Sequence, residues 1–279
     1  MKTFKYLFFL VIGITIGIVA NRNREYLINA QFIRNHWHFR KPVDDKNKII
    51  NSDKVMFLLA FGQSNSANYG MGNYVCKNEV YNYYKGELYK AQEPLLGPEG
   101  PGSSVWTRVA DMLIDSGIYK KVIIVGCGIG STPVNSWAEG SSKKVLEKTL
   151  DYLKKDNLKL THILWEQGET DNANNTTKTQ YKKDLKNVIS IVRQTQPSAP
   201  FFVSITSYFP YGEEKNILGI DTDITQAQLE VIKEGNNIKQ GPNTDSLNLC
   251  YYRYNDLHFT EHGLDKLAYK WFKQIKANQ

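Results

Sequence analysis

Cysteine is scarce in this chain: three residues in 279, at Cys76, Cys127 and Cys250. None of their spacings is that of a zinc site or of a Cys-x-x-Cys redox motif. We therefore predict no metal site and no thiol chemistry. Two arrangements stay open at this point, because export would permit one disulfide with one free thiol, whereas burial would keep all three thiols reduced.

Clusters of basic charge are also missing. The formal net charge is +7, but the lysines and arginines are scattered among acidic residues. A nucleic-acid surface needs basic side chains gathered on one face, so we predict no nucleic-acid partner. Internal repeats and low-complexity tracts are absent as well. A chain of this length with 41% hydrophobic residues is instead long enough for one large globular domain.

Long hydrophobic runs are absent except at the N-terminus. Lys2 and Lys5 precede an apolar run at residues 6–20, which has the pattern of an export signal. Ile18 occupies a position where signal cleavage after Ala20 requires a small residue, so we favour an uncleaved membrane anchor over a cleaved signal peptide. The run is nevertheless shorter than the roughly 20 residues of a typical spanning helix. We predict an exported, periplasmic or extracytoplasmic protein with three parts: the signal at 1–20, a linker at 21–52 and a catalytic domain at 53–279.

Apolar runs alternate with helical patterns from residue 54 onward. This alternation predicts an α/β fold, a three-layer α/β/α sandwich with a central parallel sheet. Residues 68–104 form a long tyrosine-rich stretch that we interpret as a substrate-facing insertion. The predicted strands are 55–61, 121–127, 160–165, 201–206 and a weaker fifth at 247–251; the predicted helices are 105–115, 143–154, 179–194, 224–233 and 264–275.

Polar, glycine-rich segments follow four of these strands, at residues 62–66, 128–132, 166–171 and 255–258. Ligands of such sheets bind beyond the carboxyl ends of the strands, so we expect these segments to form one site. Ser64 is a candidate nucleophile and His258 its candidate base, because a serine attacks only when a base takes its proton. Taken alone, each has a purely structural interpretation, as a helix-capping serine and a packed histidine.

The segments together resemble the conserved blocks of SGNH (GDSL) hydrolases, in the sialate O-acetylesterase-like branch known as carbohydrate esterase family 6. Residues 61–65, Phe-Gly-Gln-Ser-Asn, resemble block I, and residues 130–137 resemble the Gly-Gly-Thr-Ser-x-x-x-Trp block. Residues 165–171, Trp-Glu-Gln-Gly-Glu-Thr-Asp, resemble the Trp-x-Gln-Gly-Glu-x-Asp block, which is the most specific. Residues 256–258 lie where the family has Asp-x-x-His. The resemblance runs from about residue 55 to the C-terminus.

This resemblance implies a flavodoxin-like fold, Ser64 as nucleophile, His258 as base and no cofactor. It implies an oxyanion hole made by the Ser64 amide, Gly130 and Gln167. The chain departs from the family pattern at Ser131, which replaces a glycine. The candidate supporting residues, each with a structural alternative, are Asn65, Glu169 and Asp171.

The acid partner of His258 is a second departure. Asn255 occupies the usual position three residues before the histidine, and Asp256 stands two residues before it. We predict Asp256 as the acid, while a Ser–His dyad and a more distant carboxylate stay open.

The predicted function is release of acetate from O-acetylated carbohydrates, sialic acid or another glycan, through an acyl-enzyme. Two alternatives remain from the sequence. In a glycan O-acetyltransferase of the SGNH type, a sugar hydroxyl would replace water. In a catalytically inactive glycan-binding module, Ser64 would form no acyl-enzyme.

Overall fold

A computed structural model describes residues 40–211 and 217–279 of the chain. The compact unit spans Pro42–Gln279. Val43, Ile49 and Ile50 pack against its core, so folded structure begins before the predicted boundary at residue 53. Within the described part, no helix has the length and apolar character needed to cross a membrane. The predicted signal at residues 1–20 lies outside the described residues.

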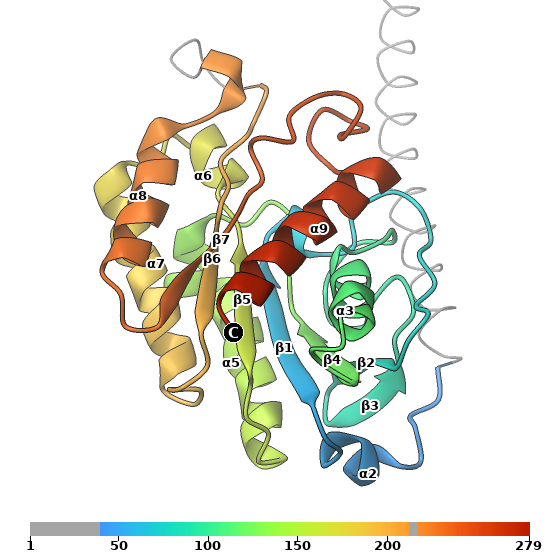
Figure 1. Ribbon diagram of the computed structural model, residues 1–279. Coiled ribbons are helices and arrows are strands. Elements are labelled where there is room, and N and C mark those ends of the chain that lie inside the picture. The colour runs from blue at the N-terminus through green and yellow to red at the C-terminus, as the bar shows by residue number, and fades with distance from the viewer. Residues whose placement is uncertain (1–39, 212–216) are drawn as a thin grey trace, which may run out of the picture. The chain divides into compact units, whose positions relative to one another are not determined.

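Seven strands form one sheet at the centre of this unit, in the order β3-β2-β4-β1-β5-β6-β7 (Figure 1). Neighbouring strands are parallel except for the β2–β3 hairpin. The mostly parallel sheet confirms the predicted α/β class. The strands are β1 (Val55–Gly62), β2 (Val80–Tyr84), β3 (Glu87–Lys90), β4 (Lys121–Gly126), β5 (His162–Glu166), β6 (Phe201–Ile205) and β7 (Ile238–Asn243).

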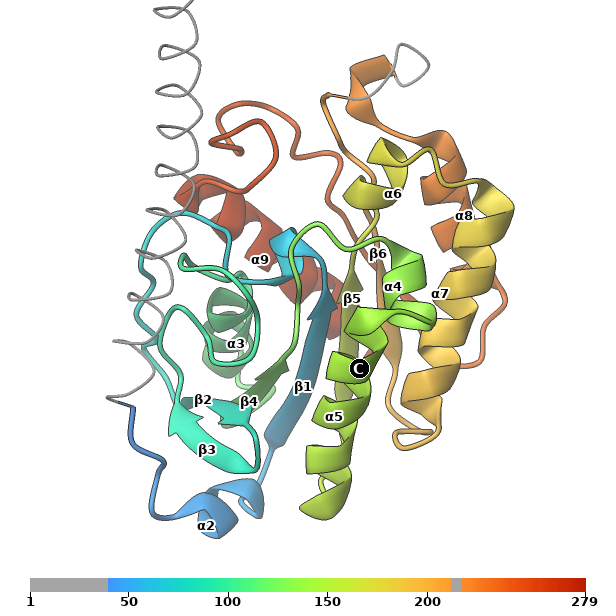
Figure 2. The ribbon, with the colours of Figure 1, turned by 180° about the vertical axis from the view of Figure 1, so that it is seen from behind.

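Helices cover both faces of the sheet, which explains why the central strands are apolar on both sides. Along β1, Phe57, Leu59 and Phe61 pack on one face, and alternate residues such as Leu58 pack on the other. Figures 1 and 2 show the two helical layers. One layer contains α4 (Val134–Ala138), α5 (Ser141–Lys155), α7 (Lys178–Arg193) and α8 (Thr222–Lys233); the other contains α3 (Trp106–Asp115) and α9 (Glu261–Ala277). The short elements are α2 (Lys46–Ile50), α6 (Glu169–Ala173), η1 (Ser64–Ser66) and η2 (Ile217–Gly219).

Four predicted strands and all five predicted helices are confirmed, but the fifth predicted strand is wrong. Residues 247–251 form no strand, and the sheet ends instead at β7. The β7 sequence, Ile-Lys-Gln-Gly-Pro-Asn, is polar because an edge strand contacts only one neighbour, where Pro242 is tolerated. The stretch 68–104 also contains the β2–β3 hairpin, whose two-residue turn at Lys85 and Gly86 has positive φ at both positions.

All three cysteines are free thiols. Cys127 is buried at the end of β4, and burial raises the pKa of its thiol to about 12. Of the two arrangements that the sequence left open, the structure thus has the one without a disulfide.

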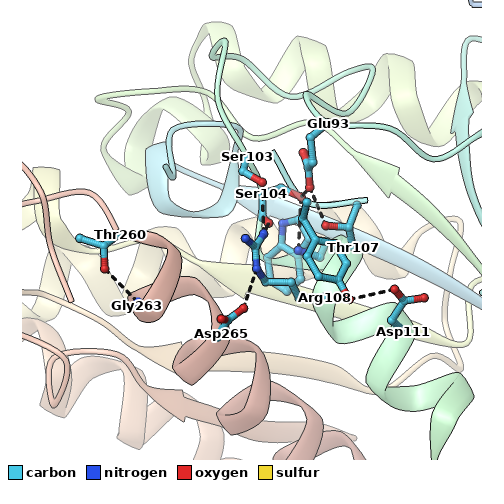
Figure 3. Close-up of polar contacts among 11 residues, drawn as sticks. Glu93, Ser103, Ser104, Thr107, Arg108, Asp111, Thr260, Gly263 and Asp265 are labelled. Carbon is cyan, nitrogen blue, oxygen red and sulfur yellow. Dashed lines mark hydrogen bonds and ion pairs between the residues drawn. The ribbon is translucent and has the colours of Figure 1, made fainter. Parts of the chain in front are cut away.

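A buried polar network ties the loop after β3 to both helices of one layer (Figure 3). Arg108 of α3 donates through Nε to Asp265 of α9 at 2.8 Å and through Nη1 to Ser103 at 3.1 Å. The Thr260 hydroxyl accepts from the Gly263 amide and caps the start of α9. These contacts fix the first turn of α9, which directly follows the segment containing His258.

We predict that Gly62→Ala strongly destabilises the fold. Gly62 has φ +139°, and a Cβ there would lie 2.0 Å from the Glu166 carbonyl oxygen of β5. The clash with backbone adds to the strain of positive φ, so we expect a loss of about 2–5 kcal/mol in the free energy of unfolding, measured by chemical denaturation. Gly117→Ala is the matched control, since Gly117 also has positive φ but a Cβ there meets nothing within 4 Å. Equal losses in the two variants would show that the contact with β5 is unimportant.

Candidate active site

Ser64 lies at the carboxyl edge of the sheet, where β1 ends and the single turn η1 begins. The preceding residues are held against the end of β5: Gly62 pairs with Glu166, and the Gln63 amide donates to the Glu166 carbonyl at 3.1 Å. Ser64 itself is 4% exposed. The contact with β5 therefore sets the position of the serine turn between the segments that follow β4 and β5.

Asn65 joins this turn to two other segments. Its Nδ2 donates to Oε1 of Glu169 at 2.6 Å and to the Leu257 carbonyl at 3.4 Å. Arg253 donates to the same carbonyl. The serine turn, the segment after β5 and the segment before α9 thus meet at one side chain. Asn65 and Glu169, which the sequence suggested as supporting residues, are thus hydrogen-bonded to each other.

His258 is half-buried beside the ring of Tyr69, which is stacked on it at 5.2 Å between centroids. The ring of Tyr254 is tilted against that of His258, with 6.0 Å between the ring centroids. The Tyr254 hydroxyl donates to the Tyr69 carbonyl. Burial and then the nearby Arg253 lower the pKa of His258 to about 4. The imidazole is therefore neutral at physiological pH. Among the hydrogen bonds of the described residues, none joins the Ser64 hydroxyl to this ring.

The prediction that Asp256 orients His258 is wrong. Asp256 has φ +58°, and its Oδ2 accepts from the Tyr211 hydroxyl at 3.1 Å, away from the imidazole. Asn255 contacts the ring instead, with 2.9 Å between its Nδ2 and Nδ1 of His258. The left-handed backbone at Asp256 redirects its side chain, and the three-residue spacing of Asn255 places an amide where the family has a carboxylate.

The predicted oxyanion role of Gln167 also conflicts with the structure. Its Nε2 lies 2.5 Å from Oδ2 of Asp171 and 3.1 Å from the Thr132 carbonyl, and the side chain is fully buried. An amide nitrogen has two hydrogens, and both are directed to acceptors of the protein. Asp171 also accepts from the Val134 amide at the start of α4. Gln167 and Asp171 therefore fasten the segments after β4 and β5 to each other.

Gly130 borders the site on the β4 side. Its amide donates to Oε2 of Glu99 at 3.0 Å, and a Cβ there would lie 2.8 Å from the Tyr69 hydroxyl. Ser131, which replaces a family glycine, keeps the left-handed backbone with φ +53°. Tyr69 touches both Gly130 and His258, so the insertion 68–104 contributes residues to this edge. An oxyanion at the Gly130 amide would have to displace the exposed Glu99 carboxylate.

Of the buried ionisable groups beneath the site, the sequence analysis named Glu169 but missed Arg253, Asp245 and Glu166. Arg253 is 2% exposed and donates through Nε to the Leu247 carbonyl at 2.7 Å. Burial raises the pKa of the carboxyls of Glu169 and Asp245, and raises that of Glu166 to about 8. The signal that could have revealed them is an acid, Glu166, directly after the apolar strand run. In the parts of the chain that the structure covers, no three His, Cys, Asp or Glu side chains are grouped to hold a metal ion.

Residues 53–276 match a family model described as carbohydrate esterase, sialic acid-specific acetylesterase. The chain belongs to this family. It is therefore a carbohydrate esterase, a hydrolase that acts on esters, and the resemblance drawn from the four sequence blocks is confirmed. No curated protein matches the chain.

Solved structures share the fold of this carbohydrate esterase at low sequence identity. An Arabidopsis thaliana protein is 18% identical, with TM-score 0.65 over 81% of this chain and 99% of its own. A carbohydrate acetylesterase from Xanthomonas citri is 17% identical, with TM-score 0.55 over 79% of this chain and 55% of its own. A family 3 carbohydrate esterase from Clostridium thermocellum is 14% identical, with TM-score 0.51 over 81% and 97%. At these identities the likeness establishes the α/β/α fold.

We predict that Glu166 makes a contribution to the free energy of unfolding that decreases as pH rises from about 5 to 8. Glu166 has a pKa of about 8 in the folded protein against 4.5 for the free side chain, because burial disfavours its charge. Since the folded state holds the proton more tightly, this stabilisation is complete below pH 4.5 and is lost as pH approaches 8, at about 1.4 kcal/mol per pH unit.

Glu166→Gln keeps the shape of the protonated acid. It should reduce the slope of the free energy of unfolding against pH, obtained from denaturation curves measured between pH 5 and 8. Other buried carboxyls retain part of the slope. The exposed Glu139→Gln is the control and should leave it unchanged. A slope that is identical in wild type and Glu166→Gln would contradict the proton uptake assigned to this residue.

Proposed function

We propose that Ser64 is the nucleophile of a carbohydrate O-acetylesterase and that His258 is its general base. The Ser64 hydroxyl oxygen bonds to the acetyl carbon, and His258 accepts the hydroxyl proton. The bond between the acetyl carbon and the sugar oxygen then breaks, and His258 returns the proton to that oxygen. Water attacks the acetyl-enzyme with His258 again as base, which releases acetate and restores Ser64.

The observation that carries this proposal is the bridge from Asn65 to Leu257. It joins the residue after Ser64 to the residue before His258, although the two are almost 200 positions apart in the chain. Ser64 also opens a turn whose first backbone N–H groups have no intrahelical acceptor, so its amide is a donor for an oxyanion. The family match supports acyl transfer from a sugar as the reaction at this edge of the sheet.

The substrate that we propose is an O-acetylated sialic acid or a related glycan. The family description supports this choice. Exposed tyrosines also surround the segment that carries His258: Tyr211 is 63% exposed, Tyr251 58% and Tyr254 46%. Their broad, partly apolar faces suit packing against sugar rings.

Ser64→Ala should lower acetate release at least about 100-fold, because no other group can form the acyl-enzyme. The measurement is acetate release from O-acetylated sialic acids, acetylated xylan and O-acetylated peptidoglycan. Ser66→Ala is the matched control: it lies in the same turn, its hydroxyl is buried with no hydrogen-bond partner among the described residues, and activity should persist. Unchanged rates in Ser64→Ala would reject the nucleophile, and acetyl transfer to added glycan in preference to water would identify a transferase.

We also propose that residues 6–20 export the protein and anchor it to a membrane. The basic residues ahead of this apolar run support the proposal. The full chain should sediment with membranes when expressed, and a chain beginning near Asn21 should remain in the supernatant. Recovery of a mature protein whose first residue is close to Asn21, from an exporting host, would indicate a cleaved signal peptide instead.

A further inference from the structure

The side chain of Asn255 contacts both the backbone and the ring of His258. Its Oδ1 accepts from the His258 amide at 2.8 Å and from the Leu257 amide at 3.4 Å. Backbone N–H groups can only donate, so the oxygen must face them and Nδ2 must face the ring. The distance from Nδ2 to Nδ1 of His258 is 2.9 Å. An amide NH₂ can only donate, so Nδ1 accepts this hydrogen bond with its lone pair.

A neutral imidazole with an unprotonated Nδ1 carries its proton on Nε2. A general base of the serine-hydrolase kind needs the opposite arrangement, with Nδ1–H donated to an orienting acceptor and a free lone pair on Nε2. We propose that Asn255 is a positioning residue that holds His258 in the Nε2-protonated tautomer and thereby limits the rate of acyl transfer. This inference rests on the proposed role of His258 as base.

The groups that face His258 offer no competing acceptor for an Nδ1 proton. Tyr69 is stacked on the ring, Tyr254 is tilted against it, and the Arg253 guanidinium is a cation. The Asp256 carboxylate is hydrogen-bonded to Tyr211. Within residues 40–211 and 217–279, Asn255 is therefore the one side chain that forms a hydrogen bond with Nδ1.

Replacing this amide with a carboxylate should reverse the tautomer. In Asn255→Asp, one carboxylate oxygen can keep the bonds to the two backbone amides, and the other can accept from Nδ1–H. The proton then leaves Nε2 for Nδ1 through solvent, and the freed Nε2 lone pair is available to the Ser64 hydroxyl. The carboxylate also stabilises the imidazolium that forms during the reaction.

The test compares acetate release by the full chain and by Asn255→Asp, with 4-nitrophenyl acetate and O-acetylated sialic acid as probes. We expect the variant to be faster by about 100- to 10,000-fold, the range that a wrong tautomer costs in a serine hydrolase. The pH below which kcat/KM declines should also rise, because a carboxylate beside Nδ1 favours the protonated ring. Equal rates and an unchanged pH profile would overturn the proposal.

The double variant Asn255→Asp/Asp256→Asn is the matched control, because it keeps the net charge of this segment constant. It should retain the gain if the contact with Nδ1 is responsible. A gain that disappears in the double variant would assign the effect to charge alone and overturn the proposal.

Nitrogen-15 NMR of His258 reads the tautomer without reference to activity, with the signals assigned by their loss in His258→Gln. The full chain should show a protonated Nε2 and an unprotonated Nδ1, and Asn255→Asp should show the reverse. A protonated Nδ1 in the unsubstituted chain, or an unprotonated Nδ1 in the variant, would overturn the proposal. If neither protein hydrolyses any ester, the proposed function fails while these spectra still decide the tautomer.

Discussion

The buried guanidinium of Arg253 holds the geometry on which the candidate active site depends. Its guanidinium donates to the backbone carbonyls of Thr244, Leu247 and Leu257. It also lies 4.2 Å from the centroid of the Phe259 ring. These contacts fold the irregular segment between β7 and α9 back onto the end of the sheet. Because a buried charge is costly unless it is hydrogen-bonded, these three bonds leave the segment little freedom to rearrange.

The Leu257 carbonyl also connects this segment to the turn that contains Ser64. It accepts from Arg253 and from Asn65, whose amide is fixed by the Glu169 carboxyl in turn. The serine turn and the histidine segment therefore share one acceptor instead of being positioned independently. A second hydrogen bond joins α9 to the end of β5, because the Trp271 indole donates to the Glu166 carboxyl.

Burial shifts the pKa values of the ionisable groups in this region. The pKa of Glu166, Glu169 and Asp245 is raised and that of His258 is lowered, in each case mainly by burial. Burial thus works against the charged form of each of these groups.

The sequence by itself determined the class of the fold and predicted where the chemistry takes place. Strands buried on both faces are continuous apolar runs, and the polar segments after them meet at one edge, which is where Ser64 lies. The pairing of Ser64 with His258 came from the resemblance to the family's sequence blocks. The edge strands β3 and β7 have one neighbour each and weak patterns, which is why they were missed, and β2 was missed together with its hairpin partner β3. Only the tertiary structure decided which groups face one another. The left-handed backbone at Asp256 and the acceptors around Gln167 redirect two side chains, because hydrogen bonds depend on direction and distance that sequence spacing does not specify.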